Sequence, residues 1–143
     1  MVFAATSAEL TVAIDLRSGT RAWERQIGST NDPWVAGDWL YLLTGDAEVV
    51  CLDRETGSVR WVTALPRWED EADREGLIVW NGPVLVGDRL VVAGSRGEAF
   101  TLSPYTGDPL GRETLPDGVE AAPVVADGTL YFLTNDGSLV AYR

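Results

Sequence analysis

The chain has 143 residues, is 45% hydrophobic and 23% charged, and carries a net charge of −11 at pH 7. This charge argues against a nucleic-acid binder, which needs basic side chains to neutralise phosphates. The absence of His and Lys removes the commonest general base, a common metal ligand and any Schiff-base lysine. No apolar run approaches the ~20 residues of a membrane-spanning helix, and a single Cys permits no internal disulfide.

Short apolar strands separated by polar turns follow one another along the chain, and their order repeats. The apolar block Val2–Ser7 recurs as Leu40–Gly45, Leu90–Ser95 and Leu130–Asn135. A fixed period of this kind indicates a repeat architecture. The repeat predicts a partial unit over 1–29, complete units over 30–68 and 77–114, a partial unit over 119–143, and an inserted acidic loop over 65–77.

A second signature, with Asp, Gly and Trp at the same offsets, joins the last two strands of a unit. Its members are Asp15, Gly19 and Trp23 in the first unit and Asp53, Gly57 and Trp61 in the second. A third copy keeps Gly107 but has Ser103 and Gly111 in place of the Asp and the Trp. The Asp can accept backbone N–H bonds across a turn, the Gly can take a positive φ, and the Trp can be buried between neighbouring sheets. We therefore predict a structural role for these residues.

Strands such as Leu40–Leu43 are apolar on both faces, so both faces should be covered. Four-stranded sheets stacked around an axis meet this requirement, and they define a β-propeller. The predicted fold class is all-β, a propeller fragment of about three to four blades that does not close a ring on its own. We expect other polypeptide to complete it, either the remainder of the propeller or a second copy of this chain.

One segment departs from the repeat, because the spacing between the second and third units is wider than elsewhere. The extra residues include a Trp and four neighbouring acids: Trp68, Glu69, Asp70, Glu71 and Asp73. In a four-stranded meander this loop shares a face with Asp46, Glu48, Glu98 and Asp136, which predicts an acidic surface. Two interpretations stay open, a solvated loop whose Trp packs on the blade edge and a contact surface for a protein partner.

The single cysteine, Cys51, occupies a strand position that other units fill with Ala13, Thr101 and Ala141. A residue at such a position is expected to be a small buried apolar group. We therefore predict a structural thiol with no reactive or metal-binding role.

The pattern Ala-x-Asp-x-x-Thr/Ser-Gly-x-x-x-Trp resembles the tryptophan-docking motif of quinoprotein-type propellers, also called PQQ-like repeats. This superfamily includes the pyrroloquinoline-quinone dehydrogenases and the non-enzymatic BamB lipoproteins. Residues 13–23 match the motif closely, 51–61 have Cys for the Ala, and the third copy is degenerate. Segments 65–90, 103–119 and 123–143 further resemble the C-terminal half of BamB-like outer-membrane protein assembly factors.

The resemblance implies a scaffold subunit at the periplasmic side of the outer membrane, without enzymatic activity, cofactor or metal. Its implied partners are the periplasmic domains of the central barrel-assembly protein and unfolded outer-membrane proteins. BamB-like proteins carry a signal peptide and a lipidated Cys, which this chain lacks, so we expect a fragment whose anchor lies elsewhere. Two alternatives are a fragment of a quinone-dependent dehydrogenase and a generic propeller interaction module.

Overall fold

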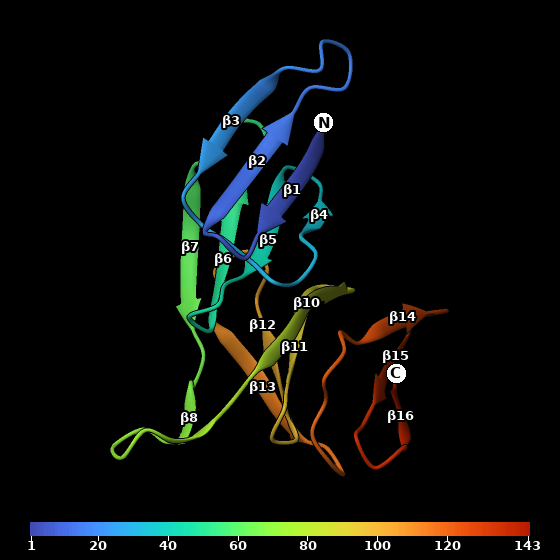
Figure 1. Cartoon of the computed structure of the whole chain (residues 1–143). Coiled ribbons are helices and arrows are strands. Elements are labelled where there is room, and N and C mark those ends of the chain that lie inside the picture. The colour runs from blue at the N-terminus through green and yellow to red at the C-terminus, as the bar shows by residue number, and fades with distance from the viewer.

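The computed structural model describes every residue from Met1 to Arg143 and consists of strands and turns (Figure 1). The first sheet contains β1 (Val2–Thr6), β2 (Leu10–Ile14) and β3 (Arg21–Arg25). The second contains β4 (Trp34–Ala36), β5 (Trp39–Leu43), β6 (Glu48–Asp53) and β7 (Val59–Ala64). The chain forms no apolar helix of membrane-spanning length.

The second half of the chain repeats this arrangement. A two-stranded hairpin, β8 (Trp68–Asp70) and β9 (Glu75–Leu77), precedes the third sheet. That sheet contains β10 (Trp80–Val86), β11 (Arg89–Gly94), β12 (Glu98–Leu102) and β13 (Pro109–Thr114). The last sheet contains β14 (Val124–Ala126), β15 (Thr129–Leu133) and β16 (Leu139–Tyr142).

Each sheet is an antiparallel meander in which the strands pair in chain order. Figure 1 shows the four sheets following one another in an arc, with β3 and β7 on its outer side and β4 and β14 on its inner side. The arc is open, and no sheet closes on the first. The predicted fold class, an all-β propeller fragment that does not form a closed ring, is therefore confirmed.

The core lies between neighbouring sheets, because the central strands are apolar on both faces. In β5, Leu40 and Leu42 are fully buried towards the first sheet, while Tyr41 and Leu43 pack towards the third. A third apolar cluster, which includes Phe132, joins the last two sheets. Complete burial of a Leu side chain contributes about 1.5–3 kcal/mol, so this two-sided packing is the main force that holds the sheets together.

The segment expected to be an acidic loop is more ordered than the sequence pattern indicated. Trp68 pairs with Leu77, and Asp70 pairs with Glu75, which makes the insertion a short hairpin. Its polar composition carries little signal for a strand, and the Asp70 side chain supplies the turn by accepting the N–H of Ala72 at 3.0 Å.

Candidate functional site

The Asp of the repeated motif organises the turn that joins the last two strands of a sheet. The Asp53 carboxylate accepts the N–H of Glu55 at 2.8 Å and that of Thr56 at 2.9 Å. These bonds, chiefly the one from Thr56, stabilise the charged form and hold the pKa of Asp53 below its usual value. Asp15 forms the same turn one sheet earlier, and its pKa is lowered mainly by the N–H of Ser18.

The Trp of the first motif docks on the second motif. Its indole Nε1 donates to the carbonyl of Arg54 at 2.9 Å, and the Trp23 side chain is 8% exposed. The ring lies against Gly57, where a Cβ atom would approach two indole carbons at 2.7 Å. Two residues after the Trp, Arg25 donates from Nε to the Gly57 carbonyl at 2.8 Å. The Gly is therefore needed for close approach of the ring as well as for its φ of +71°.

The Trp of the second motif docks on the third copy in the same way. Trp61 Nε1 donates to the Pro104 carbonyl at 3.1 Å, and a Cβ at Gly107 would lie 2.5 Å from the ring. Thr63, which corresponds to Arg25, donates its hydroxyl to the Gly107 carbonyl at 2.6 Å. Each docked Trp therefore joins its own sheet to the turn of the next sheet along the chain.

The third copy differs at both ends of the motif. The Ser103 hydroxyl accepts the N–H groups of Tyr105 and Thr106 at 3.2 and 3.3 Å, longer than the bonds to the Asp residues. Gly111 stands where the other copies have a Trp, opposite Thr101. The last sheet contains no copy of the motif turn, so an indole at this position would find no receptor within the chain.

The candidate partner residues lie on the β8–β9 hairpin, where two of the acids hold the backbone. Glu71 accepts the N–H groups of Arg67 and Trp68 at 2.9 and 3.3 Å. Asp70 accepts the N–H groups of Ala72 and Asp73 at 3.0 and 3.1 Å. The Trp68 side chain is half-buried, and Asp73 is exposed at the tip.

Two ion pairs connect the hairpin region to the turns of the neighbouring sheets. Arg67 lies 3.6 Å from Asp46, and Arg96 lies 3.7 Å from Glu69. Both pairs are largely exposed, so each contributes little stability. Their geometry places the turns that carry Asp46 and Arg96 on the same face as the hairpin.

Sequence reasoning missed a set of contacts near the inner side of the arc. Asn31 accepts the N–H of Gly82 at 3.3 Å, and Asn81 donates to the Val119 carbonyl at 3.0 Å. Both Asn residues stand two positions before a Pro, Pro33 just ahead of β4 and Pro83 within β10, and this recurrence could have found them. They line a hollow of about 420 Å³ between three sheets.

No group of three or more His, Cys, Asp or Glu residues is arranged to hold a metal ion. The Cys51 thiol is fully buried between the second and third sheets, and burial raises its pKa to about 12.

Comparison with known sequences matches a family described as "Outer membrane protein assembly factor BamB" over residues 1–63 and 66–143. The BamB proteins of Salmonella typhimurium and Legionella pneumophila are 32% and 30% identical to the chain, over 90% and 89% of its length. The chain spans 31% of each of these two relatives.

Solved structures share the fold at lower identity. BamB from Moraxella catarrhalis superimposes with a TM-score of 0.75 at 21% identity, over 98% of this chain and 42% of that chain. Quinohemoprotein alcohol dehydrogenase from Comamonas testosteroni superimposes with a TM-score of 0.66 at 17% identity, over 78% of this chain and 19% of that chain. These similarities show the propeller fold, which hosts unrelated functions.

Proposed function

Because this chain belongs to the BamB family of outer membrane protein assembly factors, we propose that it is part of a non-enzymatic scaffold subunit that assists the insertion of outer-membrane proteins. The family match over residues 1–63 and 66–143 carries this proposal. The proposed location is the periplasmic side of the outer membrane, with the lipid anchor outside this chain. The proposed partners are the periplasmic domains of the central barrel-assembly protein and unfolded outer-membrane proteins.

The contacts of the repeated motif support a scaffold. Asp53 is engaged with its own turn, Gly57 receives an indole ring, and Trp23 bonds to a backbone carbonyl. The motif residues therefore act on the protein's own backbone and side chains, within the turn or between sheets. We therefore assign the Asp, Gly and Trp residues of the motif to the frame that holds the surface loops.

The β8–β9 hairpin is the proposed contact surface for a protein partner. It is the one insertion in the repeat, and it combines exposed carboxylates with a half-buried Trp. Because Glu71 and Asp70 bond to the hairpin backbone, its shape is preorganised, which lowers the entropy lost on binding. Asp73 at the tip and the open side of the Trp68 ring are then the groups presented to a partner.

Binding of the purified chain to the periplasmic domains of the central barrel-assembly protein tests this assignment. Asp73→Arg should weaken binding at least about fivefold, since the new Arg would face the basic group of the partner that Asp73 is proposed to contact. Trp68→Ala should cost about 2 kcal/mol of binding free energy if its ring is an anchor. Glu55→Arg is the matched control, because Glu55 is an exposed acid in the turn at the opposite end of the second sheet.

Added salt should also weaken the interaction, because exposed carboxylates are screened. Undiminished binding by both hairpin variants would remove the hairpin from the interface while leaving the scaffold proposal intact. A complete lack of binding by the parent chain, under conditions in which it is folded, would count against the scaffold proposal itself.

A further inference from the structure

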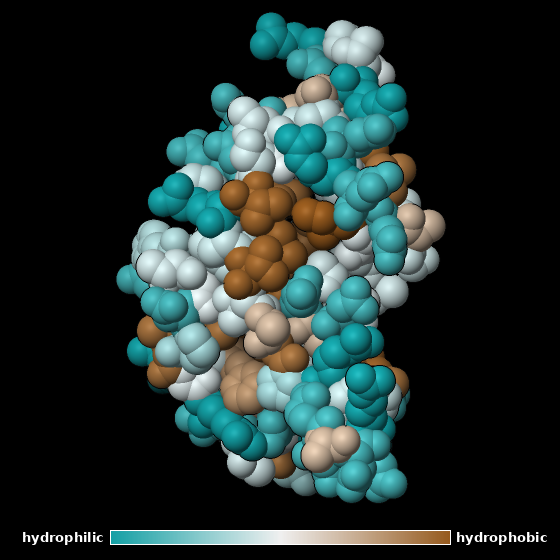
Figure 2. Space-filling model, turned by 90° about the vertical axis from the view of Figure 1, so that its left-hand side faces the viewer, coloured by the Kyte–Doolittle hydropathy of each residue, from teal (hydrophilic) through white to brown (hydrophobic).

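We propose that the free edge of β7, together with the hollow beside it, binds an extended polypeptide segment that presents an apolar side chain followed by a basic one. The hollow measures about 390 Å³ and lies between the first and second sheets. Its floor is apolar, formed by Ile27, Val50 and Val62. Figure 2 shows apolar side chains gathered on the outer side of the molecule, where β3 and β7 lie.

The corresponding place on the third sheet is filled. Val62 pairs with Val50 across β6 and β7, and the equivalent pair on the third sheet is Arg112 with Phe100. There the Arg112 guanidinium lies 5.5 Å from the Phe100 ring, which also stacks on Trp80 at 5.1 Å. The second sheet has no such cover, and Val62 remains 50% exposed.

The backbone beside Val62 offers an unpaired strand edge. β7 is the last strand of its sheet and has no partner on its outer side. Its sequence, VRWVTA, contains no Pro and only one charged residue. By contrast, β13 begins with Pro109 and carries Arg112 and Glu113, the devices that protect an edge from strand addition. The outer strand of the first sheet, β3, has the sequence RAWER and carries three charged residues. Among β3, β7 and β13, β7 is therefore the least protected.

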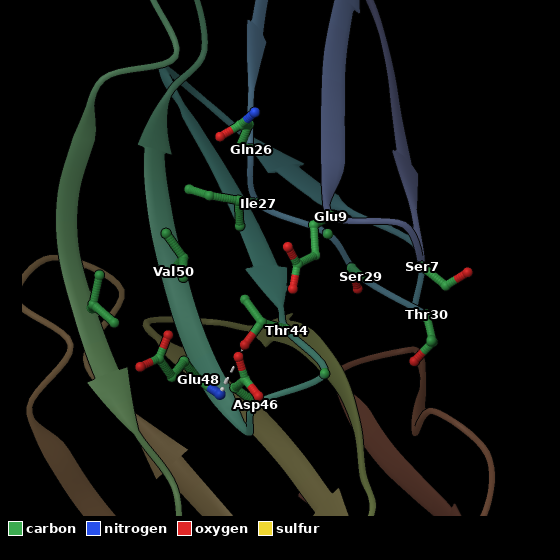
Figure 3. Close-up of a pocket in the computed structure, with 13 residues that line it drawn as sticks. Ser7, Glu9, Gln26, Ile27, Ser29, Thr30, Thr44, Asp46, Glu48 and Val50 are labelled. Atoms are coloured by element: carbon green, nitrogen blue, oxygen red, sulfur yellow. Dashed lines mark hydrogen bonds between the residues drawn. The ribbon is translucent and has the colours of Figure 1, made fainter.

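The charge around the hollow favours an occupant of the opposite charge. Glu9, Asp46 and Glu48 line the hollow beside its apolar floor (Figure 3). Arg67 lies 3.6 Å from Asp46 and offsets one of these three carboxylates. The remaining negative charge favours a Lys or Arg side chain next to the apolar group that enters the hollow.

Strand addition brings these features together in one binding mode. A segment that pairs antiparallel with β7 gains main-chain hydrogen bonds, and its alternate side chains point to the face that carries Val62. A side chain opposite Val62 lies about 5 Å from it, which is close enough to reach the hollow. This site adjoins the hairpin, because Arg67 next to β8 pairs with Asp46 of the lining. It is defined by β7 and the hollow alone and does not rest on the proposed function.

A fluorescent eight-residue peptide with alternating Leu and Thr and one Lys near its end is a suitable probe. Fluorescence anisotropy with the full chain should show saturable binding. Val62→Arg should weaken it at least about tenfold, because the long charged side chain occupies the hollow. Val124→Arg is the matched control and should leave binding unchanged, since Val124 is another exposed Val, on the edge strand of the last sheet.

Two further measurements separate strand pairing from general adhesion of apolar peptide. Methylation of alternate backbone nitrogens along one edge of the peptide should abolish binding, and methylation along the other edge should leave it intact. Glu48→Gln should weaken binding of the Lys peptide and leave a peptide without Lys unaffected. The proposal fails if binding does not saturate by about 1 mM peptide, if Val62→Arg binds like the parent, or if both methylated peptides behave alike.

Discussion

Replacing Gly57 with Ala tests whether the motif glycine is a receptor for the Trp of the preceding sheet. Gly19 and Gly57 hold the same place in their turns and have nearly the same φ, +70° and +71°. An added Cβ at Gly19 meets nothing within 4 Å, whereas at Gly57 it would lie 2.7 Å from the Trp23 ring. The two variants therefore share one backbone cost and differ in the docking contact alone.

The magnitudes follow from these contacts. Ala at a positive φ costs about 1–2 kcal/mol, which is the whole expected loss for Gly19→Ala. At Gly57 the indole must also move, which adds about 1–3 kcal/mol of overpacking. Its displacement from the Arg54 carbonyl forfeits a hydrogen bond worth about 1 kcal/mol. Gly57→Ala should therefore lower the free energy of unfolding by about 3–6 kcal/mol.

Urea unfolding followed by indole fluorescence measures both losses, and Gly107→Ala provides an independent repeat of the test at Trp61. We expect Gly57→Ala and Gly107→Ala to be destabilised alike, and both more strongly than Gly19→Ala. Equal losses for Gly19→Ala and Gly57→Ala would refute the docking argument, because only backbone strain would then remain.

Three more predictions concern the docked Trp residues, the Asp53 carboxylate and cofactor binding. Trp23→Ala should cost about 3–5 kcal/mol of unfolding free energy, with Trp61→Ala nearer the lower value because its ring is only half-buried; urea melts that match the parent would contradict this. The pKa of Asp53 is depressed in the fold, so its contribution to stability is present at neutral pH and is lost as pH falls from about 4 through the lower folded value. Asp53→Ser introduces the side chain that the third copy has at Ser103. In urea melts, its free energy of unfolding should therefore fall less between pH 5 and pH 2 than that of the parent. Identical pH profiles for the two proteins would argue against the turn bonds. Calorimetric titration with calcium plus pyrroloquinoline quinone should show no stoichiometric heat, and a micromolar signal would overturn the scaffold proposal.

The sheets could be predicted from the sequence because their signals are local. Alternating apolar blocks and tight turns define the strands, and the shared offsets of Asp53 and Gly57 define a turn of known geometry. The Trp residues could be assigned to a position between sheets because a large ring on an outer strand needs cover. Each of these inferences depends on residues within one unit.

The hydrogen bonds between units could not be predicted, because their acceptors are backbone carbonyls, which carry no sequence signal. Trp23 bonds to the carbonyl of Arg54, and Trp61 bonds to that of Pro104, so the side chain at the acceptor position is irrelevant. The hollow beside Val62 likewise depends on how far apart the first two sheets lie. Strand pairing in the hairpin was missed since its acidic sequence resembles that of a loop.

Cys51 offers a way to follow how the second and third sheets separate. Its thiol is fully buried, and burial raises its pKa to about 12, so almost no thiolate exists at pH 8. Cys51 also lies opposite Trp61 in the register of β6 and β7. Both residues pack in the apolar cluster between the second and third sheets. A thiol reagent should therefore react only when this interface opens.

We expect the folded chain to resist labelling by a maleimide at pH 7–8 and to react completely in urea. Gly107→Ala displaces Trp61 from the third sheet and should accelerate labelling under native conditions. Gly57→Ala acts at the interface between the first and second sheets, so at matched overall stability it should accelerate labelling less. Rapid labelling of the parent, at the rate of a free thiol, would show that Cys51 is not sealed between the sheets. Equal acceleration by the two variants would show that the sheets open together, and that the docked Trp residues do not control separate interfaces.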